Sequence, residues 1–196
     1  MKHWKPAVIA ALWSGALYAA PMPVVASFSI LGDVAQQIGG ERVAVQSLVG
    51  ANQDAHAYNL TSSDIKKIRE ARLVLLNGLG LEKAELQRAV KQSKVASAEA
   101  TAGIKPLAAD EHHHSHEHDH DHGEFDPHVW NDPVLMQRYA ANVAIALIKA
   151  DPAGSRYYQQ RFKDYQNVLN QLNNYANRQF GAVAPAKRKV LTGHDS

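Results

Sequence analysis

The chain has 196 residues, of which 45% are hydrophobic, so it can bury the core of one ordinary domain, or of one domain and part of a second. Its formal charge of +2 is too small to favour nucleic acid or an anionic membrane surface as a partner. The absence of cysteine excludes disulfide bonds and thiolate metal sites, and we expect no lipid-anchor cysteine.

Residues 1–20 are predicted to be a secretory signal peptide. Lys2 and Lys5 give a short positive region, and an apolar run at 7–20 ends in small residues. This run is too short to span a bilayer comfortably, and no stop-transfer sequence follows it. The alternative is a buried N-terminal helix. We therefore expect a soluble, exported protein in the periplasm, with no segment inserted in a membrane.

Strand-like and helix-like segments alternate up to about residue 98. Apolar or β-rich runs predict strands, and helical periodicity or capping signals predict the helices between them. The segment 52–59 has no apolar periodicity and is predicted to be a loop. This alternation predicts an α/β fold, in which a parallel sheet carries helices on its faces. The predicted strands span residues 23–28, 43–49, 73–76 and 94–98, and the predicted helices span residues 31–38, 61–71 and 81–90.

The composition changes abruptly at residues 110–124, which contain only histidine, aspartate, glutamate, serine and glycine. With no apolar residue to bury, this segment is predicted to be a solvated, mobile loop. Imidazoles at alternate positions share one side of an extended chain and suit Zn²⁺, Cu²⁺ or Ni²⁺. The alternative is a linker of accidental composition. The loop histidines are His112, His113, His114, His116, His118, His120 and His122.

Two Asp-Pro pairs predict helix starts after this loop, with Asp as the N-cap and Pro at the first helical position. The pair at 132–133 opens a helix to about residue 150, and the pair at 151–152 opens a long amphipathic helix to about residue 180. Residues 187–192 favour the first strand of a new unit. We therefore expect the chain to be a fragment of a longer protein or a truncated product.

Three isolated histidines, His56, His128 and His194, are the candidate ligands outside the loop. Zinc readily takes neutral imidazole nitrogens and prefers four ligands. His56 and His194 each follow a predicted strand, where ligands collect at the carboxyl edge of an open sheet. His56 could equally be an exposed loop residue without a role.

His128 lies between apolar residues and a helix start, which suits a fixed, partly buried imidazole. Asp126 or Asp132 could accept the proton on its second nitrogen and so orient the ring. The alternative is a buried structural histidine. Sequence spacing alone does not decide, because the three candidates are far apart in the chain.

These residues closely resemble those of ZnuA-type zinc-binding proteins, the solute receptors of zinc and manganese ABC importers. The resemblance covers residues 24–196, and any single block of it would be weak. The matching blocks are residues 26–33 (ASFSILGD), 54–56 (DAH), 76–82 (LNGLGLE), the acidic histidine loop, 126–130 (DPHVW) and 193–195 (GHD).

The resemblance implies two α/β lobes joined by one long helix, with metal in the cleft between the lobes. Residues 21–150 would form the N-terminal lobe, 151–180 the connecting helix and 187–196 the start of a second lobe. His56 and His128 match the two ligands of the first lobe, and His194 matches the first ligand of the second. Manganese-preferring relatives carry a carboxylate at that last position, so three imidazoles favour zinc.

The implied function is capture of Zn²⁺ as a transported ligand by a monomer, and its delivery to an ABC-type permease in the inner membrane. No catalysis is expected. The alternatives are a manganese receptor of the same type, and a histidine-rich periplasmic metal buffer or chaperone. A zinc hydrolase is a further rival, but it needs a general base beside the metal. Outside the histidine-rich loop no His-Glu-x-x-His motif is present, and Glu124 is the one obvious base near His128.

Overall fold

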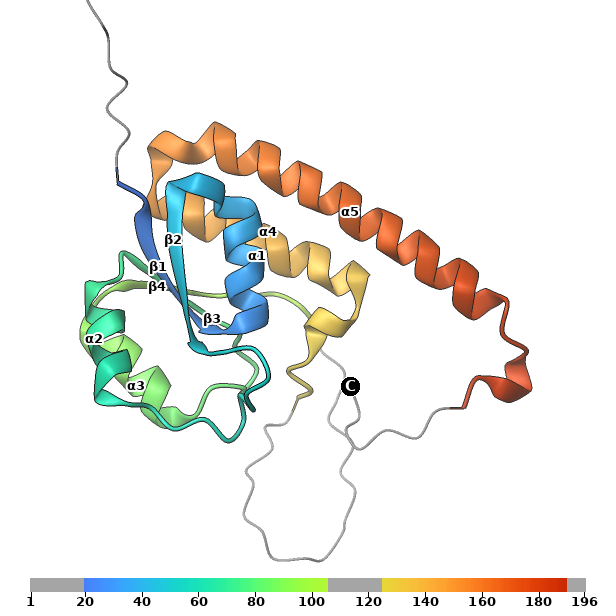
Figure 1. The fold of residues 1–196 in the computed structure, drawn as a ribbon, viewed down its shortest axis with the longest axis horizontal. Coiled ribbons are helices and arrows are strands. Elements are labelled where there is room, and N and C mark those ends of the chain that lie inside the picture. Colours follow the sequence, from blue (N-terminus) through green and yellow to red (C-terminus); the bar gives the residue numbers. More distant parts are fainter. Residues whose placement is uncertain (1–19, 106–124, 190–196) are drawn as a thin grey trace, which may run out of the picture.

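Four parallel strands form the centre of the computed structural model, which describes residues 20–105 and 125–189 (Figure 1). The strand order is β2-β1-β3-β4. Helices cover both faces of this sheet, so the α/β fold predicted from the sequence is confirmed. The strands are β1 (Met22–Phe28), β2 (Val43–Val49), β3 (Leu73–Leu76) and β4 (Ala96–Glu99).

The helices divide between the two faces of the sheet (Figure 1). One face carries α1 and α4, with α5 packed on them, and the other carries α2 and α3. No helix within the described residues is long and apolar enough to cross a membrane. The helices are α1 (Ser29–Gly39), α2 (Ser62–Glu70), α3 (Ala84–Ser93), α4 (Pro133–Ala150) and α5 (Ser155–Gly181).

The central strand β1 is buried on both of its faces, which explains why it is almost continuously apolar. Successive side chains of a strand point to opposite sides of the sheet. Val24 and Ala26 therefore lie in the cluster formed with α1, α4 and α5, whereas Val25 lies in the cluster formed with α2 and α3. Both faces of the sheet are thus fixed by packing, and the loops at its carboxyl edge are built on a rigid base.

The predicted capping signals of α2 and α4 are confirmed. The side chain of Thr61 accepts a hydrogen bond from the backbone of Asp64, and the Asp64 carboxylate accepts one from the backbone of Thr61 at 3.0 Å, which completes a capping box. Asp132 caps α4 by accepting from Val134 N at 2.7 Å. These caps set where the segments on either side of each helix enter it.

The helix α3 begins later than predicted, at Ala84 instead of residue 81. The reason is Glu82, whose carboxylate accepts hydrogen bonds from the backbone of Asn77 at 2.6 Å and of Gly78 at 3.1 Å. This carboxylate closes the turn after β3, and Gly78 supports that turn with a φ of 88°. The residues before Ala84 therefore belong to the turn and not to the helix.

The long helix also begins later than predicted. Asp151 accepts from Gly154 N at 3.3 Å and opens a short 3₁₀ helix (Pro152–Gly154), after which α5 starts at Ser155. The strand predicted at 187–192 is not seen in its described part, because Lys187 ends another 3₁₀ helix (Pro185–Lys187).

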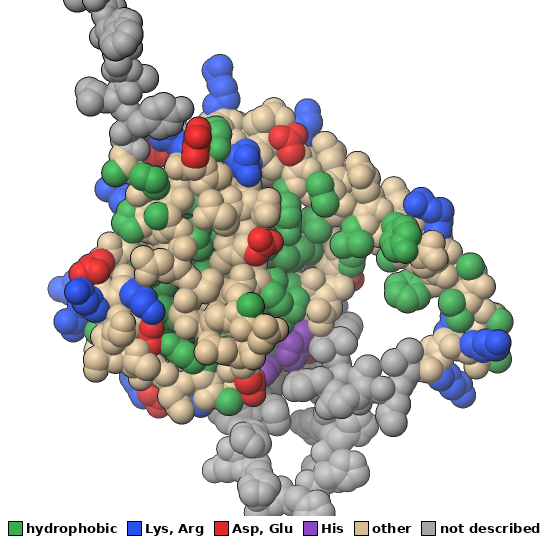
Figure 2. All heavy atoms as spheres, in the orientation of Figure 1, with side chains coloured by type: hydrophobic (Ala, Val, Ile, Leu, Met, Phe, Trp, Pro, Cys, Tyr) green, Lys and Arg blue, Asp and Glu red, His purple; other side chains and the backbone are tan. Residues whose placement is uncertain are grey.

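The start of α5 is fixed to the amino edge of the sheet by a partly buried ionic cluster. Asp151 accepts from Tyr158 at 2.7 Å and from Arg42, the residue before β2, at 2.7 Å. Burial, and to a smaller extent the hydrogen bond to Asp151, raises the pKa of Tyr158 to about 12. The far half of α5 runs beyond the sheet, and green apolar side chains lie along it in Figure 2. The large apolar side chains exposed on this half of α5 are Val168, Leu172, Tyr175 and Phe180.

Three predicted features lie outside the described residues and are not tested by the structure. They are the signal peptide at 1–20, apart from its last residue, the histidine-rich loop at 110–124, and His194.

Candidate metal centre

Two of the predicted ligands, His56 and His128, lie next to each other at the carboxyl edge of the sheet, with their rings tilted by 51°. His56 is in the loop between β2 and α2, and His128 is in the segment that leads into α4. Their Nε2 atoms are 3.1 Å apart and their ring centroids are 5.2 Å apart. The purple side chains in Figure 2 mark this position. The fold thus brings together two imidazoles that are 72 positions apart in the sequence.

The orientation of the His128 ring is set by Asp126. The Nδ1 atom of His128 lies 2.6 Å from Asp126 Oδ1, and the same oxygen accepts from the His128 backbone at 2.9 Å. Because a carboxylate only accepts hydrogen bonds, the ring proton belongs on Nδ1, and the lone pair on Nε2 faces His56. Asp132, the other predicted partner, instead caps α4.

An aromatic wall closes one side of the His128 ring. Trp130 makes an edge-to-face contact with this ring, with ring centroids 5.1 Å apart. Trp130 in turn contacts Phe28 at the end of β1, with ring centroids 4.8 Å apart. The His128 side chain is 13% exposed. Its Nε2 atom therefore faces His56 from a largely buried position, where electrostatic interactions are stronger than in water.

The loop that carries His56 is attached to α2 through Tyr58. The Tyr58 hydroxyl donates to the carboxylate of Asp64, the acid of the capping box. Burial raises the pKa of Tyr58 well above its ordinary value, and the bond to Asp64 raises it further. Within the loop, Asp54 accepts from the backbone of His56 at 2.9 Å. His56 therefore lies in a turn closed by Asp54, two residues before the attachment of the loop at Tyr58.

Asp64 receives several hydrogen bonds in this network. Burial alone raises its pKa, but bonds from Thr61, Tyr58 and Lys67 outweigh burial and lower the pKa to about 2. The ammonium of Lys67 lies 3.0 Å from this carboxylate. Sequence reasoning identified the capping box but missed Tyr58, although a tyrosine so close to a candidate ligand is a usable signal.

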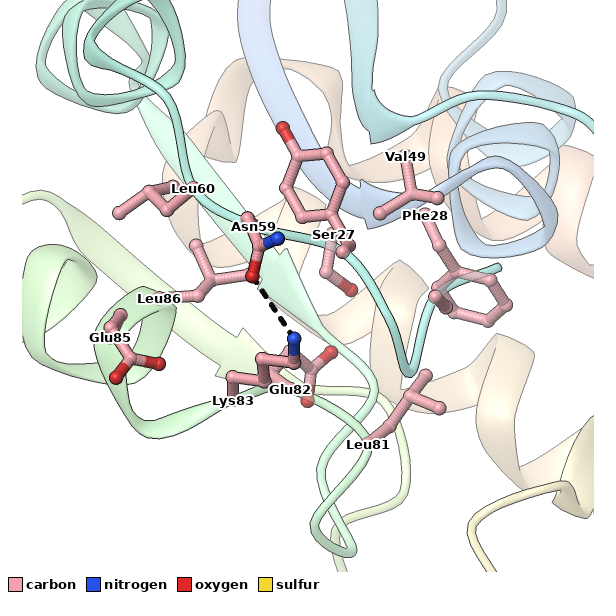
Figure 3. A pocket seen from close by; sticks show the side chains of 12 residues that line it. Ser27, Phe28, Val49, Asn59, Leu60, Leu81, Glu82, Lys83, Glu85 and Leu86 are labelled. Carbon is pink, nitrogen blue, oxygen red and sulfur yellow. Dashed lines mark hydrogen bonds between the residues drawn. The ribbon is translucent and has the colours of Figure 1, made fainter. Parts of the chain in front are cut away.

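A cavity of about 390 Å³ lies beneath the His56 loop, between the ends of β1 and β2 and the start of α3 (Figure 3). Asn59 of the loop and Lys83 are joined beside it by a hydrogen bond of 3.1 Å. Ser27 lines it, and the buried Ser27 hydroxyl has no hydrogen-bond partner among the described residues. Neither candidate ligand lines this cavity, so it is separate from the imidazole pair.

Within residues 20–105 and 125–189, no group of three or more His, Asp or Glu side chains is placed to hold a metal ion. The described part of the centre therefore offers two neighbouring imidazoles. The third predicted ligand, His194, and the seven loop histidines lie outside the described residues.

Comparison with known proteins identifies metal-transport proteins. Residues 24–196 match the family described as the periplasmic component A of the zinc-uptake complex, ZnuA. The manganese ABC transporter substrate-binding lipoprotein PsaA of Streptococcus anginosus is 31% identical over 173 residues, which are 87% of this chain and 55% of that protein. The zinc-binding protein TroA of Treponema pallidum is 30% identical over 177 residues, covering 88% of this chain and 54% of that protein.

A solved structure supports the same grouping. The manganese-bound periplasmic metal-binding protein of Candidatus Liberibacter asiaticus superposes with a TM-score of 0.74 at 31% identity, over 85% of this chain and 60% of that one. The chain thus spans about half of the length of the curated relatives it matches. The family is one of solute receptors of ABC transporters and not of enzymes. The chain belongs to the ZnuA family of periplasmic metal-uptake components.

Proposed function

We propose that this protein captures Zn²⁺ in the periplasm and delivers it to an ABC-type permease in the inner membrane. Zinc is the cargo, and His56, His128 and His194 are its proposed protein ligands. The observation that carries the proposal is the pair of facing Nε2 atoms, 3.1 Å apart. Two imidazoles bound to one tetrahedral Zn²⁺ would have nitrogens about 3.3 Å apart, given Zn–N bonds of about 2.0–2.1 Å.

The protonation pattern also suits a divalent cation. The proton on His128 Nδ1 is held by Asp126, so Nε2 is available as a ligand without a change of tautomer. At this distance the two nitrogens can share one hydrogen bond with a single proton between them, whereas two lone pairs would repel each other. A metal ion would therefore replace one shared proton at the pair.

The choice of zinc depends on the third ligand. If His194 completes a set of three imidazoles, the site favours zinc, because manganese prefers more oxygen ligands. A manganese receptor of the same type is the main alternative, and the relative from Streptococcus anginosus is named for that metal. A metal buffer or chaperone that works through the histidines at 112–122 is the second alternative.

We also propose the arrangement of lobes and the periplasmic location that the sequence predicts. Residues 21–150 form the N-terminal lobe, 151–180 the connecting helix and 187–196 the start of a second lobe, in a monomer exported by residues 1–20 without a lipid anchor. The exposed apolar side chains on the far half of α5 support a second lobe, because they form a surface that a further domain could cover. The greater length of the matched relatives supports it too.

Metal titration of the full chain tests this function. Zinc and manganese are added in competition with a chelator of known affinity, first to the wild type. We expect one tight zinc site, lost in the double variant His56→Ala/His128→Ala and weakened in His194→Ala. A variant lacking residues 112–122 is the matched control, and it should keep the tight site while losing any weak additional ones.

Three outcomes would contradict the proposal. Loss of the tight site in the loop deletion would assign binding to the loop and favour the buffer function. Manganese binding tighter than zinc would favour the manganese receptor. A double histidine variant that binds as tightly as the wild type would show that the facing pair is not the metal centre.

A further inference from the structure

The turn after β3 contains a buried side chain that reaches the His128 segment. Asn77 is fully buried, at 0% exposure. Its Nδ2 atom donates to the carbonyl oxygen of Pro127, the residue before His128, at 3.1 Å, and to the carbonyl of Gly78 at 3.0 Å. Its Oδ1 atom accepts from the hydroxyl of Tyr139 on α4 at 3.0 Å. From the sequence, this asparagine was only part of the matching block 76–82 and had no predicted role of its own.

The chemistry of its partners fixes the orientation of this amide. The carbonyl oxygens of Pro127 and Gly78 can only accept, so the NH₂ group must face them, whereas the tyrosine hydroxyl can donate to the opposite end. The backbone of Asn77 is held as well, by Glu82 at its N–H and by the Thr101 hydroxyl at its carbonyl, at 2.5 Å. The amide is therefore immobilised before it contacts the His128 segment.

We propose that Asn77 is a positioning residue for the metal centre, which holds the segment 126–128 so that His128 Nε2 faces His56. This inference rests on the proposed function, because it concerns the same pair of ligands. Asp126 sets the rotation of the ring but belongs to the same short segment, so it cannot place that segment relative to the sheet. The bond from Asn77 to Pro127 joins the segment to the carboxyl end of β3, adjacent to β1 in the sheet.

The substitution Asn77→Asp tests the role of the amide with little change of shape. It keeps an acceptor for Tyr139 but places a second oxygen against two carbonyl oxygens. Even a protonated aspartic acid could restore only one of the two donated bonds. We expect zinc affinity to fall by about tenfold, at the lower end of what loss of an outer partner of a metal ligand costs.

A readout that general destabilisation would not move is the behaviour of the two imidazoles during titration. In the wild type, the ¹⁵N signals of His56 and His128 should respond together to one equivalent of Zn²⁺. In Asn77→Asp they should respond at different zinc concentrations, because the two rings no longer share the ion from the start. The matched control is Asn142→Asp, which also removes amide bonds to two backbone carbonyls, those of Ala100 and Ala102 at 2.8 Å each, but leaves Asn77 and its bond to Pro127 in place. It should lower stability but keep the wild-type affinity.

The outcomes separate this inference from the proposed function. If the wild type binds zinc through both imidazoles, and Asn77→Asp does so within twofold of the same affinity, the positioning role is wrong and the function stands. If zinc moves neither imidazole in the wild type, the function itself is overturned, and this inference with it. Should Asn77→Asp fail to fold, Tyr139→Phe replaces it, since it removes the partner that fixes the amide. An affinity unchanged in that variant would also count against the inference.

Discussion

The two ends of β2 carry the same kind of polar cluster in two different roles. At the carboxyl end, Tyr58 and Lys67 bind the carboxylate of Asp64. At the amino end, Tyr158 and Arg42 bind the carboxylate of Asp151. In both clusters burial is the largest cause that raises the pKa of the tyrosine, and the hydrogen bond to its aspartate is the second. One cluster holds the loop of a candidate ligand, and the other holds the start of a long helix.

The comparison shows that a strong local network need not belong to a binding site. Both aspartates have lowered pKa values, since hydrogen bonds outweigh the opposing effect of burial. Perturbed groups of this kind often mark functional sites, but structural networks produce the same signature. Here the distinguishing feature is position, because Tyr58 lies two residues from His56, whereas the Asp151 cluster lies at the opposite edge of the sheet. Substitutions in the two clusters should therefore separate metal binding from stability.

The largest effect is expected from Asp64→Asn, through stability. The pKa of Asp64 is about 2 in the folded protein, below its ordinary value of 3.8. A carboxyl whose pKa is lower when folded stabilises the protein above its unfolded pKa, and this contribution is lost as the pH falls toward the folded pKa. We expect Asp64→Asn to lower the free energy of unfolding at pH 7 by about 2–3 kcal/mol.

The test is urea unfolding of both proteins at several pH values. The difference between the wild type and Asp64→Asn should shrink steadily as the pH falls from about 5 to about 2. Glu70→Gln on the same helix is the control, because Glu70 is 66% exposed and its substitution should change the free energy of unfolding only slightly. A difference for Asp64→Asn that stays constant with pH would mean that the ionised carboxylate is not what stabilises the loop.

A matched pair of substitutions, Tyr58→Phe and Tyr158→Phe, tests the comparison directly. Each removes one phenol that donates to the aspartate of its cluster, which should lower the free energy of unfolding by about 1–2 kcal/mol. Zinc affinity should fall by about threefold to fivefold in Tyr58→Phe, as the His56 loop loses its attachment to α2, and should stay unchanged in Tyr158→Phe. Chelator competition and urea unfolding measure the two quantities. Equal losses of affinity would mean that binding follows global stability and not the position of the loop.

Much of the fold could be predicted because apolar strands and capping residues are local signals. The runs that became β2 and β3 were predicted at their observed bounds, β2 from its β-rich alternating pattern at the edge of the sheet and β3 from a short apolar run that is buried throughout. The start of α3 was predicted wrongly because Glu82 is a good helix former whose carboxylate is used by the preceding turn. Asp151 misled in a similar way, since it caps a 3₁₀ turn before the long helix.

The candidate metal centre could be predicted only in part from the sequence. A predicted strand end indicated His56 and a predicted helix start indicated His128, but no spacing rule predicts that two side chains so distant in sequence face each other. Asn77 was missed as a supporting residue for the same reason, since its partner Pro127 is 50 positions away, beyond the histidine-rich loop. Tyr58 was missed although its partner Asp64 is only six positions away, at the start of the next helix.

The smallest effect is expected from Lys67→Met, which keeps the length and apolar stem of the side chain but removes its charge. Lys67 lies 3.0 Å from Asp64, and its side chain is 36% exposed, so water and salt screen the pair. We expect a loss of stability below about 0.5 kcal/mol at physiological ionic strength, with no change in zinc affinity. The loss should disappear in about 1 M salt, where screening extends over only a few ångströms, and urea unfolding at two salt concentrations measures it. A loss of stability as large as that of Tyr58→Phe would show that the lysine holds this network as strongly as the tyrosine does. The comparison between the two ends of β2 would then have to rest on their cations, Lys67 and Arg42.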